Sequence, residues 1–235
     1  MPRGEQLDLL LLHAPSVYDF REMSIFYGPI SDMIPSSTVF EMYPLGFLTI
    51  ASYLQKQRMR VRIVNLAARM MKGRSFSVPR FLASQHPRAI GIDLHWLPHA
   101  HGALEVAKIA KEIHPDVPVL MGGLSSTYFH QELIGYPQVD YVLRGDSTEA
   151  PLYELLLALR NGRALDQIPN LTWKQRGIMY LTTFCQLCRW LGRHLWYRSL
   201  GLGCRVNKAA SSVRSPFASR SPTKPPQPFS ATKGS

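Results

Sequence analysis

Two adjacent glycines with hydroxyl residues beyond them are the part of the sequence best suited to bind a ligand. Gly122 and Gly123 follow an apolar run at residues 117–121, and Ser125 and Ser126 come shortly afterwards. Glycines at the end of a buried strand let a large group approach the backbone, and serine hydroxyls bond amide or phosphate groups. Neither a G-x-G-x-x-G pattern nor a lysine follows, which excludes a dinucleotide fingerprint and a P-loop. A tight turn is the alternative interpretation of the two glycines.

Asp93 ends another apolar run, residues 89–92, at the place where a phosphate-accepting receiver domain carries its aspartate. That chemistry also needs acidic residues after the first strand, which hold Mg²⁺, and a lysine after the fifth strand. The sequence has His13-Ala14-Pro15-Ser16 and Leu143-Arg144-Gly145 at those two places. The receiver interpretation therefore fails on two of its three parts.

Three histidines, His95, His99 and His101, follow Asp93 closely. Imidazoles and a carboxylate are zinc ligands, but no cysteine lies near and the spacing is not that of a known ligand set. We interpret this segment as a polar loop.

The segments that must position these residues alternate between strand and helix patterns. Short apolar runs typical of covered parallel strands occur at residues 7–12, 61–66, 89–92, 117–121 and 139–143. Helical spacing of apolar residues begins at Pro44 and recurs at residues 78–84, 102–113 and 147–161. Strands joined by helices indicate a parallel sheet with right-handed crossovers. We therefore predict an α/β fold, a flavodoxin-like doubly wound five-stranded parallel sheet, with residues 168–173 as a short exit strand.

One connection, residues 14–43, is far longer than the roughly 2–6 residues usual between a strand and a helix. It contains six aromatic residues, which argues against disorder. It starts where doubly wound sheets bind their ligands. It forms either a lid or pocket wall, or a loop that covers an edge of the sheet.

The net charge of +11 comes from the end of the chain. Of the 27 Lys and Arg residues, 10 lie between Arg176 and Ser235, where no Asp or Glu occurs, and the other 17 are balanced by all 16 acids. We predict a folded domain over residues 1–175 and a basic low-complexity tail over residues 176–235, disordered or out of frame. A basic arm that binds nucleic acid has the same composition, so a non-catalytic nucleic-acid-associated protein is the alternative function.

Cysteine usage and hydropathy bear on the compartment. The three cysteines, Cys185, Cys188 and Cys204, lie late in the chain and form no disulfide framework. No apolar run approaches the roughly 20 residues of a membrane span, and no signal-peptide pattern is found. We predict a cytoplasmic protein that does not associate with membranes.

Taken together, five segments resemble the N-terminal cobalamin (B12)-binding domain of B12-dependent radical S-adenosylmethionine (SAM) proteins. The resemblance covers about 70% of the chain, and 26 residues separate Asp93-Leu94-His95 from Gly122, the spacing found in cobalamin domains. The segments are 44–48 (PLGFL), 89–96 (AIGIDLHW), 121–125 (MGGLS), 139–146 (VDYVLRGD) and 168–171 (IPNL).

The resemblance implies a cobalamin site at the carboxyl edge of the sheet. The nucleotide tail of the cofactor would lie against the two glycines, and the corrin ring would rest on the loops after the first and third strands. The implied cofactor-binding residues are Pro15, Ser16, Asp93, Leu94, His95, Trp96, Gly122, Gly123, Leu124, Ser125, Ser126, Gly145 and Asp146.

Two departures from the family limit what the resemblance implies. The D-x-H-x-x-G loop, whose histidine binds cobalt, is missing after the first strand, and Asp93-x-His95-x-x-Pro98 mimics it only in part. His95 is therefore a weak candidate for cobalt, and we predict no metal ligand otherwise. The C-x-x-x-C-x-x-C motif that holds a [4Fe–4S] cluster and SAM is also absent, since Cys185, Cys188 and Cys204 do not reproduce it.

These observations predict the cobalamin-binding module of a methyltransferase-like B12-dependent radical SAM enzyme, truncated before its catalytic barrel. Such a barrel takes roughly 200 further residues. We expect the [4Fe–4S] cluster and SAM to belong to a radical SAM domain or a separate subunit. This chain alone is then not catalytic, and we predict no catalytic residue in it.

Overall fold

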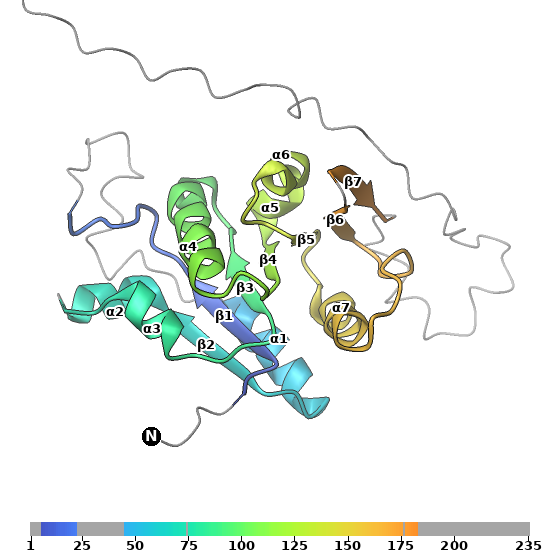
Figure 1. Cartoon of the computed structure of the whole chain (residues 1–235), viewed down its shortest axis with the longest axis horizontal. Helices are drawn as coiled ribbons and strands as arrows, with labels where there is room; N and C mark the ends of the chain where they lie inside the picture. Colours follow the sequence, from blue (N-terminus) through green and yellow to red (C-terminus); the bar gives the residue numbers. More distant parts are fainter. Residues whose placement is uncertain (1–5, 23–44, 74, 176, 183–235) are drawn as a thin grey trace, which may run out of the picture.

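The computed structural model describes residues 6–22, 45–73, 75–175 and 177–182, in which strands and helices alternate around a seven-stranded sheet (Figure 1). The strands are β1 (Leu9–His13), β2 (Val61–Asn65), β3 (Ile90–Asp93), β4 (Val119–Gly122), β5 (Tyr141–Leu143), β6 (Leu171–Gln175) and β7 (Ile178–Leu181). The helices are α1 (Leu45–Lys56), α2 (Leu66–Lys72), α3 (Val78–Ala83), the 3-10 turn η1 (Leu97–His99), α4 (Ala100–Ile113), α5 (Leu124–Tyr128), α6 (His130–Gly135) and α7 (Glu149–Asn161).

The strand order is β2-β1-β3-β4-β5-β6-β7, and the first five strands are parallel. The predicted doubly wound α/β fold is thus confirmed, with five parallel strands in the flavodoxin-like order. Each strand side chain points to the face opposite its neighbours in sequence, so each strand contributes to two apolar layers.

The sheet is larger than the five parallel strands predicted, and the short exit strand predicted at residues 168–173 overlaps β6. β6 pairs antiparallel with β5, and β7 pairs antiparallel with β6, so a hairpin covers the N–H and C=O groups on the free edge of β5. Its side chains Trp173 and Met179 are buried in the two apolar layers. The folded unit therefore continues past residue 175, the end of the domain expected from composition.

The two layers lie on opposite faces of the sheet. On one face α1 and α7 pack against the odd-numbered side chains of β1, Leu9 and Leu11, together with Leu120 of β4. On the other face α3, α4 and α6 cover Leu10 and Leu12 of β1, together with side chains of β3, β4 and β5. Helices on both faces leave the carboxyl ends of the parallel strands open between the loops, which is where such folds bind ligands.

Several short helices were not predicted. Helix α2 has seven residues, α5 five and α6 six, which is too few to show a helical period in the sequence. Helix α2 follows β2 without a loop because Asn65 caps it, its side chain accepting a hydrogen bond from the Ala68 N–H at 2.8 Å. The predicted end of α7 is confirmed, since Gly162 adopts a left-handed conformation there.

Two predictions from the sequence lie outside the described residues. They are the lid or edge-covering role of most of the aromatic connection, residues 23–43, and the character of the tail from residue 183 onward. Within the ranges that are described, no helix combines the length and the hydrophobicity needed to cross a bilayer.

Candidate functional site

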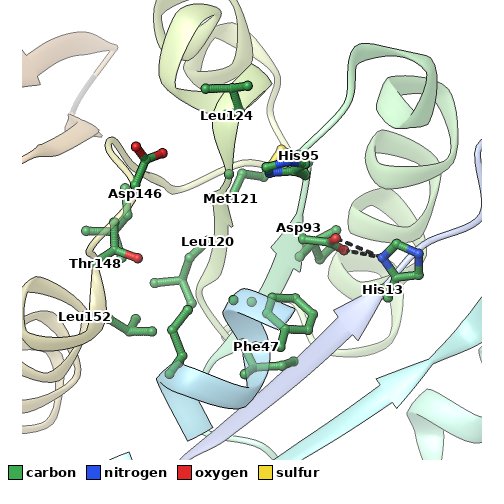
Figure 2. Close-up of a pocket in the computed structure, with 18 of the residues that line it drawn as sticks. His13, Phe47, Asp93, His95, Leu120, Met121, Leu124, Asp146, Thr148 and Leu152 are labelled. Carbon is green, nitrogen blue, oxygen red and sulfur yellow. Dashed lines mark hydrogen bonds and ion pairs between the residues drawn. The ribbon is translucent and has the colours of Figure 1, made fainter. Parts of the chain in front are cut away.

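A cavity of about 540 Å³ opens at the carboxyl ends of the parallel strands, between the sheet, α1 and α7. Figure 2 shows Phe47 of α1, Leu120 of β4 and Leu152 of α7 directed toward this space. The cavity thus lies on one face of the sheet and reaches its carboxyl edge.

The strands contribute two rows of side chains to the cavity, because residues two apart on a strand share a face. The deep row consists of Leu11, Gly91 and Leu120, which are register neighbours on β1, β3 and β4. The outer row, one pleat closer to the carboxyl edge, consists of His13, Asp93 and Gly122. The deep row is apolar, whereas the outer row carries the polar groups.

His13 and Asp93 form a buried pair in the outer row. The Nδ1 atom of His13 lies 2.8 and 3.0 Å from the two carboxylate oxygens of Asp93, and both side chains are largely shielded from solvent (Figure 2). The His99 ring lies beside the pair, 5.4 Å from the ring of His13. A carboxylate against Nδ1 accepts a hydrogen bond from the Nδ1–H group and fixes the orientation of the imidazole. The pair therefore fixes the side of the cavity formed by β1 and β3.

Gly122 has room for a side chain that no part of the described protein fills. A Cβ atom placed on Gly122 meets only the Leu143 carbonyl oxygen, at 3.9 Å. Its φ is not in the left-handed region. Packing and backbone conformation therefore do not require glycine here, and the missing side chain enlarges the cavity.

Gly123 is glycine for a different reason. Its φ is +111° and its ψ is 178°, and a Cβ atom would lie 2.9 Å from backbone atoms of Leu94 and His95. The loop after β3 is held against this point because Ser125 and Ser126 donate backbone hydrogen bonds to the His95 and Leu94 carbonyls, at 3.1 and 3.2 Å. The conformation and the close loop explain Gly123 without a ligand.

The thirteen residues predicted for the site separate into two groups. Those that line the cavity are Asp93, His95, Trp96, Gly122, Gly123, Leu124, Gly145 and Asp146. Those that do not are Pro15, Ser16, Leu94, Ser125 and Ser126.

The second group packs inside the protein. Pro15 and Ser16 lie against the first turn of α4, where Gly102 donates its N–H to the Ser16 carbonyl at 3.1 Å. Leu94 is a core residue, and the Ser125 hydroxyl donates to the His95 carbonyl at 3.0 Å. These residues support the loops around the cavity and do not form its wall.

His95 and Trp96 lie at the open rim, and Trp96 is 46% exposed. Their rings are stacked at 29° with centroids 6.5 Å apart. His101, predicted in the same loop, accepts a hydrogen bond from the Tyr18 N–H at Nδ1. No group of three or more His, Cys, Asp or Glu side chains suitable for a metal ion occurs in the part of the chain that the structure describes.

A single hydroxyl joins the two glycine-containing loops of the cavity. The Oγ1 of Thr127 donates to the Gly123 carbonyl at 2.9 Å and accepts from the Gly145 N–H at 2.8 Å. Thr127 is not itself a lining residue. It fixes the distance between the ends of β4 and β5, and with it one side of the mouth.

Arg144, beside Gly145, anchors the loop after β5 from the other side. Its buried guanidinium donates from Nη2 to the carbonyls of Leu171 and Thr182 on the β6–β7 hairpin. Burial lowers the pKa of Arg144. Burial also lowers the pKa of the nearby His130, and the charge of Arg144 lowers it further. The β6–β7 hairpin, of which the sequence predicted only a short strand at residues 168–173, thus helps to hold the loop that carries Gly145.

Sequence reasoning missed the remaining lining residues because they come from strand interiors and helix faces. Only the alternation of residues along the strands, combined with the strand order, places them together. They are Leu11, His13, Leu45, Gly46, Phe47, Ile50, Gly91, Ile92, His99, Leu120, Met121, Leu143, Thr148, Glu149 and Leu152.

A doubly wound sheet with a ligand-sized cavity at its carboxyl edge defines a ligand-binding domain of the Rossmann-like class. Within that class the chain belongs to the B12-binding domain family, whose model matches residues 34–152. This confirms the resemblance found in the sequence.

Individual proteins also match the chain, one in sequence and others in fold. The chain is 32% identical over 136 residues to "Uncharacterized methyltransferase PH0819" of Pyrococcus horikoshii, covering 57% of this chain and 28% of that protein. Among solved structures it is similar to TsrM, a radical S-adenosylmethionine methyltransferase from Kitasatospora setae, solved with cobalamin and a [4Fe-4S] cluster bound. That match has a TM-score of 0.56, 18% identity, and coverage of 77% of this chain and 30% of that one.

The fold is also similar to that of OxsB, a cobalamin-dependent S-adenosylmethionine radical enzyme solved with aqua-cobalamin and S-adenosylmethionine bound. The TM-score is 0.54 at 15% identity, with coverage of 76% of this chain and 22% of that one. The chain therefore spans less than a third of the length of each of these relatives.

Proposed function

We propose that this chain is the cobalamin-binding module of a B12-dependent radical SAM-type, methyltransferase-like enzyme. The observation that carries the proposal is Gly122. It lines the cavity, and neither packing nor backbone conformation requires a glycine at that position. The space left by the missing side chain is suited to a ligand that lies against the backbone of β4.

The described residues fit the two chemically different parts of cobalamin. An apolar space between α1, α7 and the deep row suits the aromatic base of the nucleotide tail. The exposed rim residues Trp96 and Leu124 offer apolar surface to a corrin ring, and Asp146 and Thr148 offer oxygen atoms to amide side chains. Bound cobalamin would supply a cobalt centre that carries a methyl group, while these residues would hold and orient it.

The chemistry of the complete enzyme would require parts beyond the described fold. The chain covers 22–30% of the solved radical enzymes with which it shares its fold. The [4Fe–4S] cluster and SAM would belong to a radical SAM domain or subunit that meets the open side of the cavity. Methyl transfer is then an activity of that assembly, and this chain contributes the cobalamin site.

A binding experiment tests the proposal. The purified chain is incubated with hydroxocobalamin, separated from free cofactor by gel filtration and examined by absorbance. We expect about one corrinoid per chain, and we expect Gly122→Val to elute without it. Gly135→Ala is the matched control, because a Cβ atom on Gly135 meets nothing within 4 Å and Gly135 does not line the cavity. A wild-type chain that elutes free of corrinoid would refute the proposed function.

A further inference from the structure

Charges of opposite sign are concentrated in different parts of the folded domain. Residues 45–92 contain nine Lys and Arg residues and no Asp or Glu, whereas residues 93–175 contain ten acidic residues and six basic ones. Soluble surfaces usually mix both signs. A long segment with charges of one sign therefore produces a positive electrostatic field over the surface that it forms.

The basic segment lies at one end of the sheet. It forms α1, β2, α2 and α3, and β2 is the end strand in the sheet order, beside β1 (Figure 1). All the basic side chains that the structure describes in this segment are exposed to solvent. They are Lys56, Arg58, Arg60, Arg62, Arg69, Lys72, Arg80 and Arg88.

Four of these residues come from three neighbouring elements, and we call them the basic edge: Arg62 of β2, Arg69 and Lys72 of α2, and Arg80 of α3. Figure 1 shows α2 and α3 next to each other and beside β2. Arg69 and Lys72 are three residues apart and therefore share a face of α2.

Two side-chain contacts join these elements. Arg62 donates from Nη1 to the side-chain oxygen of Gln85, just after α3, at 2.6 Å. The guanidinium carbon of Arg69 lies 5.7 and 5.0 Å from the ring centroids of Phe76 and Phe81, which places α2 against α3. The charges of β2, α2 and α3 therefore lie close to one another on the surface.

No described carboxylate neutralises the basic edge. The ion pairs of the described ranges involve none of its four residues. Within the same ranges, no large apolar side chain is exposed on β2, α2 or α3. The surface is thus positively charged and lacks an apolar centre.

This composition indicates which kind of partner would fit. Charges on an end strand discourage pairing with another sheet, but α2 and α3 have no strand edge to protect. A protein partner usually covers an apolar centre, which the basic edge lacks. Three of its four residues are arginines, whose guanidinium groups pair bidentately with phosphate. A partner with repeated phosphate groups matches these features.

We propose that the basic edge binds the phosphate backbone of double-stranded nucleic acid. A duplex carries one negative charge about every 1.7 Å along its axis, so residues on three elements can each meet a phosphate. A single strand would need exposed aromatic rings on which its bases could stack, and none is exposed among the described residues of β2, α2 and α3. This activity goes beyond the proposed function, because no residue of the basic edge lines the cavity.

The experiment measures binding of the full chain to a short fluorescein-labelled DNA duplex of mixed sequence, by fluorescence anisotropy at several salt concentrations. Each phosphate contact contributes about 0.9 to the slope of log K against log salt. Arg62→Gln/Arg80→Gln should therefore reduce the slope by about 1.8 and weaken binding at about 0.1 M salt roughly fiftyfold. Arg62→Lys/Arg80→Lys keeps both charges and should keep the wild-type slope.

Arg160→Gln/Arg163→Gln is the matched control. It also removes two exposed arginines, but they lie at the end of α7, which Figure 1 shows well separated from α2 and α3. We expect it to leave the slope and the affinity unchanged. The basic residues after Arg176 are present in every variant, so any contribution from them is the same throughout. Thermal unfolding establishes that the variants are folded. If Arg62→Gln/Arg80→Gln does not fold, Arg80→Gln alone gives the same test with a slope change of about 0.9.

Several results would overturn the proposal. They are a wild-type chain that does not bind the duplex at low salt, equal slopes for the wild type and Arg62→Gln/Arg80→Gln, and an equal loss in the control variant. Binding to phosphatidylserine vesicles without binding to the duplex would also overturn it, because the surface would then recognise a membrane. Hydroxocobalamin binding should be the same in all these variants, so failure of the proposed function and failure of this proposal are seen in separate measurements.

Discussion

Replacing the two adjacent glycines one at a time should separate ligand binding from folding. Gly122→Ala adds a methyl group to the cavity, where the nearest described atom is 3.9 Å from it. Gly123→Ala adds the same group to a backbone at φ +111°, 2.9 Å from backbone atoms of Leu94 and His95. The two substitutions are chemically identical and adjacent, so each is a control for the other.

The structure predicts different losses of unfolding free energy for the two variants. A non-glycine residue in the φ/ψ region of Gly123 costs about 1–3 kcal/mol, and the overlap with fixed backbone atoms adds to this. We therefore expect Gly123→Ala to lose about 2–4 kcal/mol of unfolding free energy. For a domain of this size about 1 kcal/mol corresponds to 2–4 °C in Tm, so the Tm should fall by at least about 4 °C. Gly122→Ala should leave the Tm unchanged or slightly raised, since alanine is favoured over glycine in a strand by about 0.5–1 kcal/mol.

Two measurements check this prediction. Thermal unfolding followed by circular dichroism, without any corrinoid, reports stability, and hydroxocobalamin titration at a temperature where both variants are folded reports binding. Gly122→Ala should weaken binding while remaining stable, and Gly122→Val should abolish binding. Equal destabilisation by the two alanine variants would refute the distinction between the glycines. Wild-type affinity in Gly122→Val would remove Gly122 from the site and with it the main support for the proposed function.

Three further predictions concern residues around the cavity. Thr127→Val removes both hydrogen bonds of the hydroxyl, so it should lower the unfolding free energy by about 1–3 kcal/mol and accelerate amide hydrogen exchange at Gly145. Thr127→Ser keeps the hydroxyl and should retain the wild-type stability and exchange rate. Identical behaviour of the two variants would contradict the role of the hydroxyl. Because burial and Arg144 lower the pKa of His130 from 6.5, the stability it contributes is present above pH 6.5 and is lost as the pH falls through its folded pKa. The Tm difference between about pH 7.5 and about pH 5.5 should therefore shrink in His130→Gln; an unchanged difference would argue against it. Electron paramagnetic resonance of bound cob(II)alamin should show no threefold nitrogen splitting of the cobalt lines; splitting that vanishes in His95→Ala would show that His95 binds cobalt.

The parallel part of the fold could be predicted because its central strands β1, β3 and β4 are buried on both faces. A strand such as Leu9–His13 then appears in the sequence as an unbroken apolar run. The β6–β7 hairpin has no such run, since β6 ends in Lys174 and Gln175 and is stabilised by pairing with β5 and by Arg144. These are contacts between residues distant in the sequence, and composition reports neither of them.

Among the residues that line the cavity, the sequence pointed to those at the ends of strands or just beyond them. Gly122, Asp93 and His95 stand at strand ends, and the resemblance to cobalamin domains pointed to them. The partner of Asp93 was missed because the pairing with His13 depends on β1 and β3 being adjacent and in register. The roles of Gly122 and Gly123 could not be distinguished from the sequence either, because the contact of Gly123 with the loop after β3 depends on how the chain folds.

Gly91 shows most clearly what additional information the structure supplies. In the sequence it is one glycine between two isoleucines. The strand alone does not tell whether the missing side chain leaves room for a ligand or for a neighbouring side chain. It becomes informative only when β3 is placed beside β4 and both are counted in steps of two, because Gly91 then lies diagonal to Gly122 on the same face. Neither strand alone contains this relation. A diagonal pair of this kind is a property of strand order and register together, so it can be found in sequences only by comparing positions on neighbouring strands.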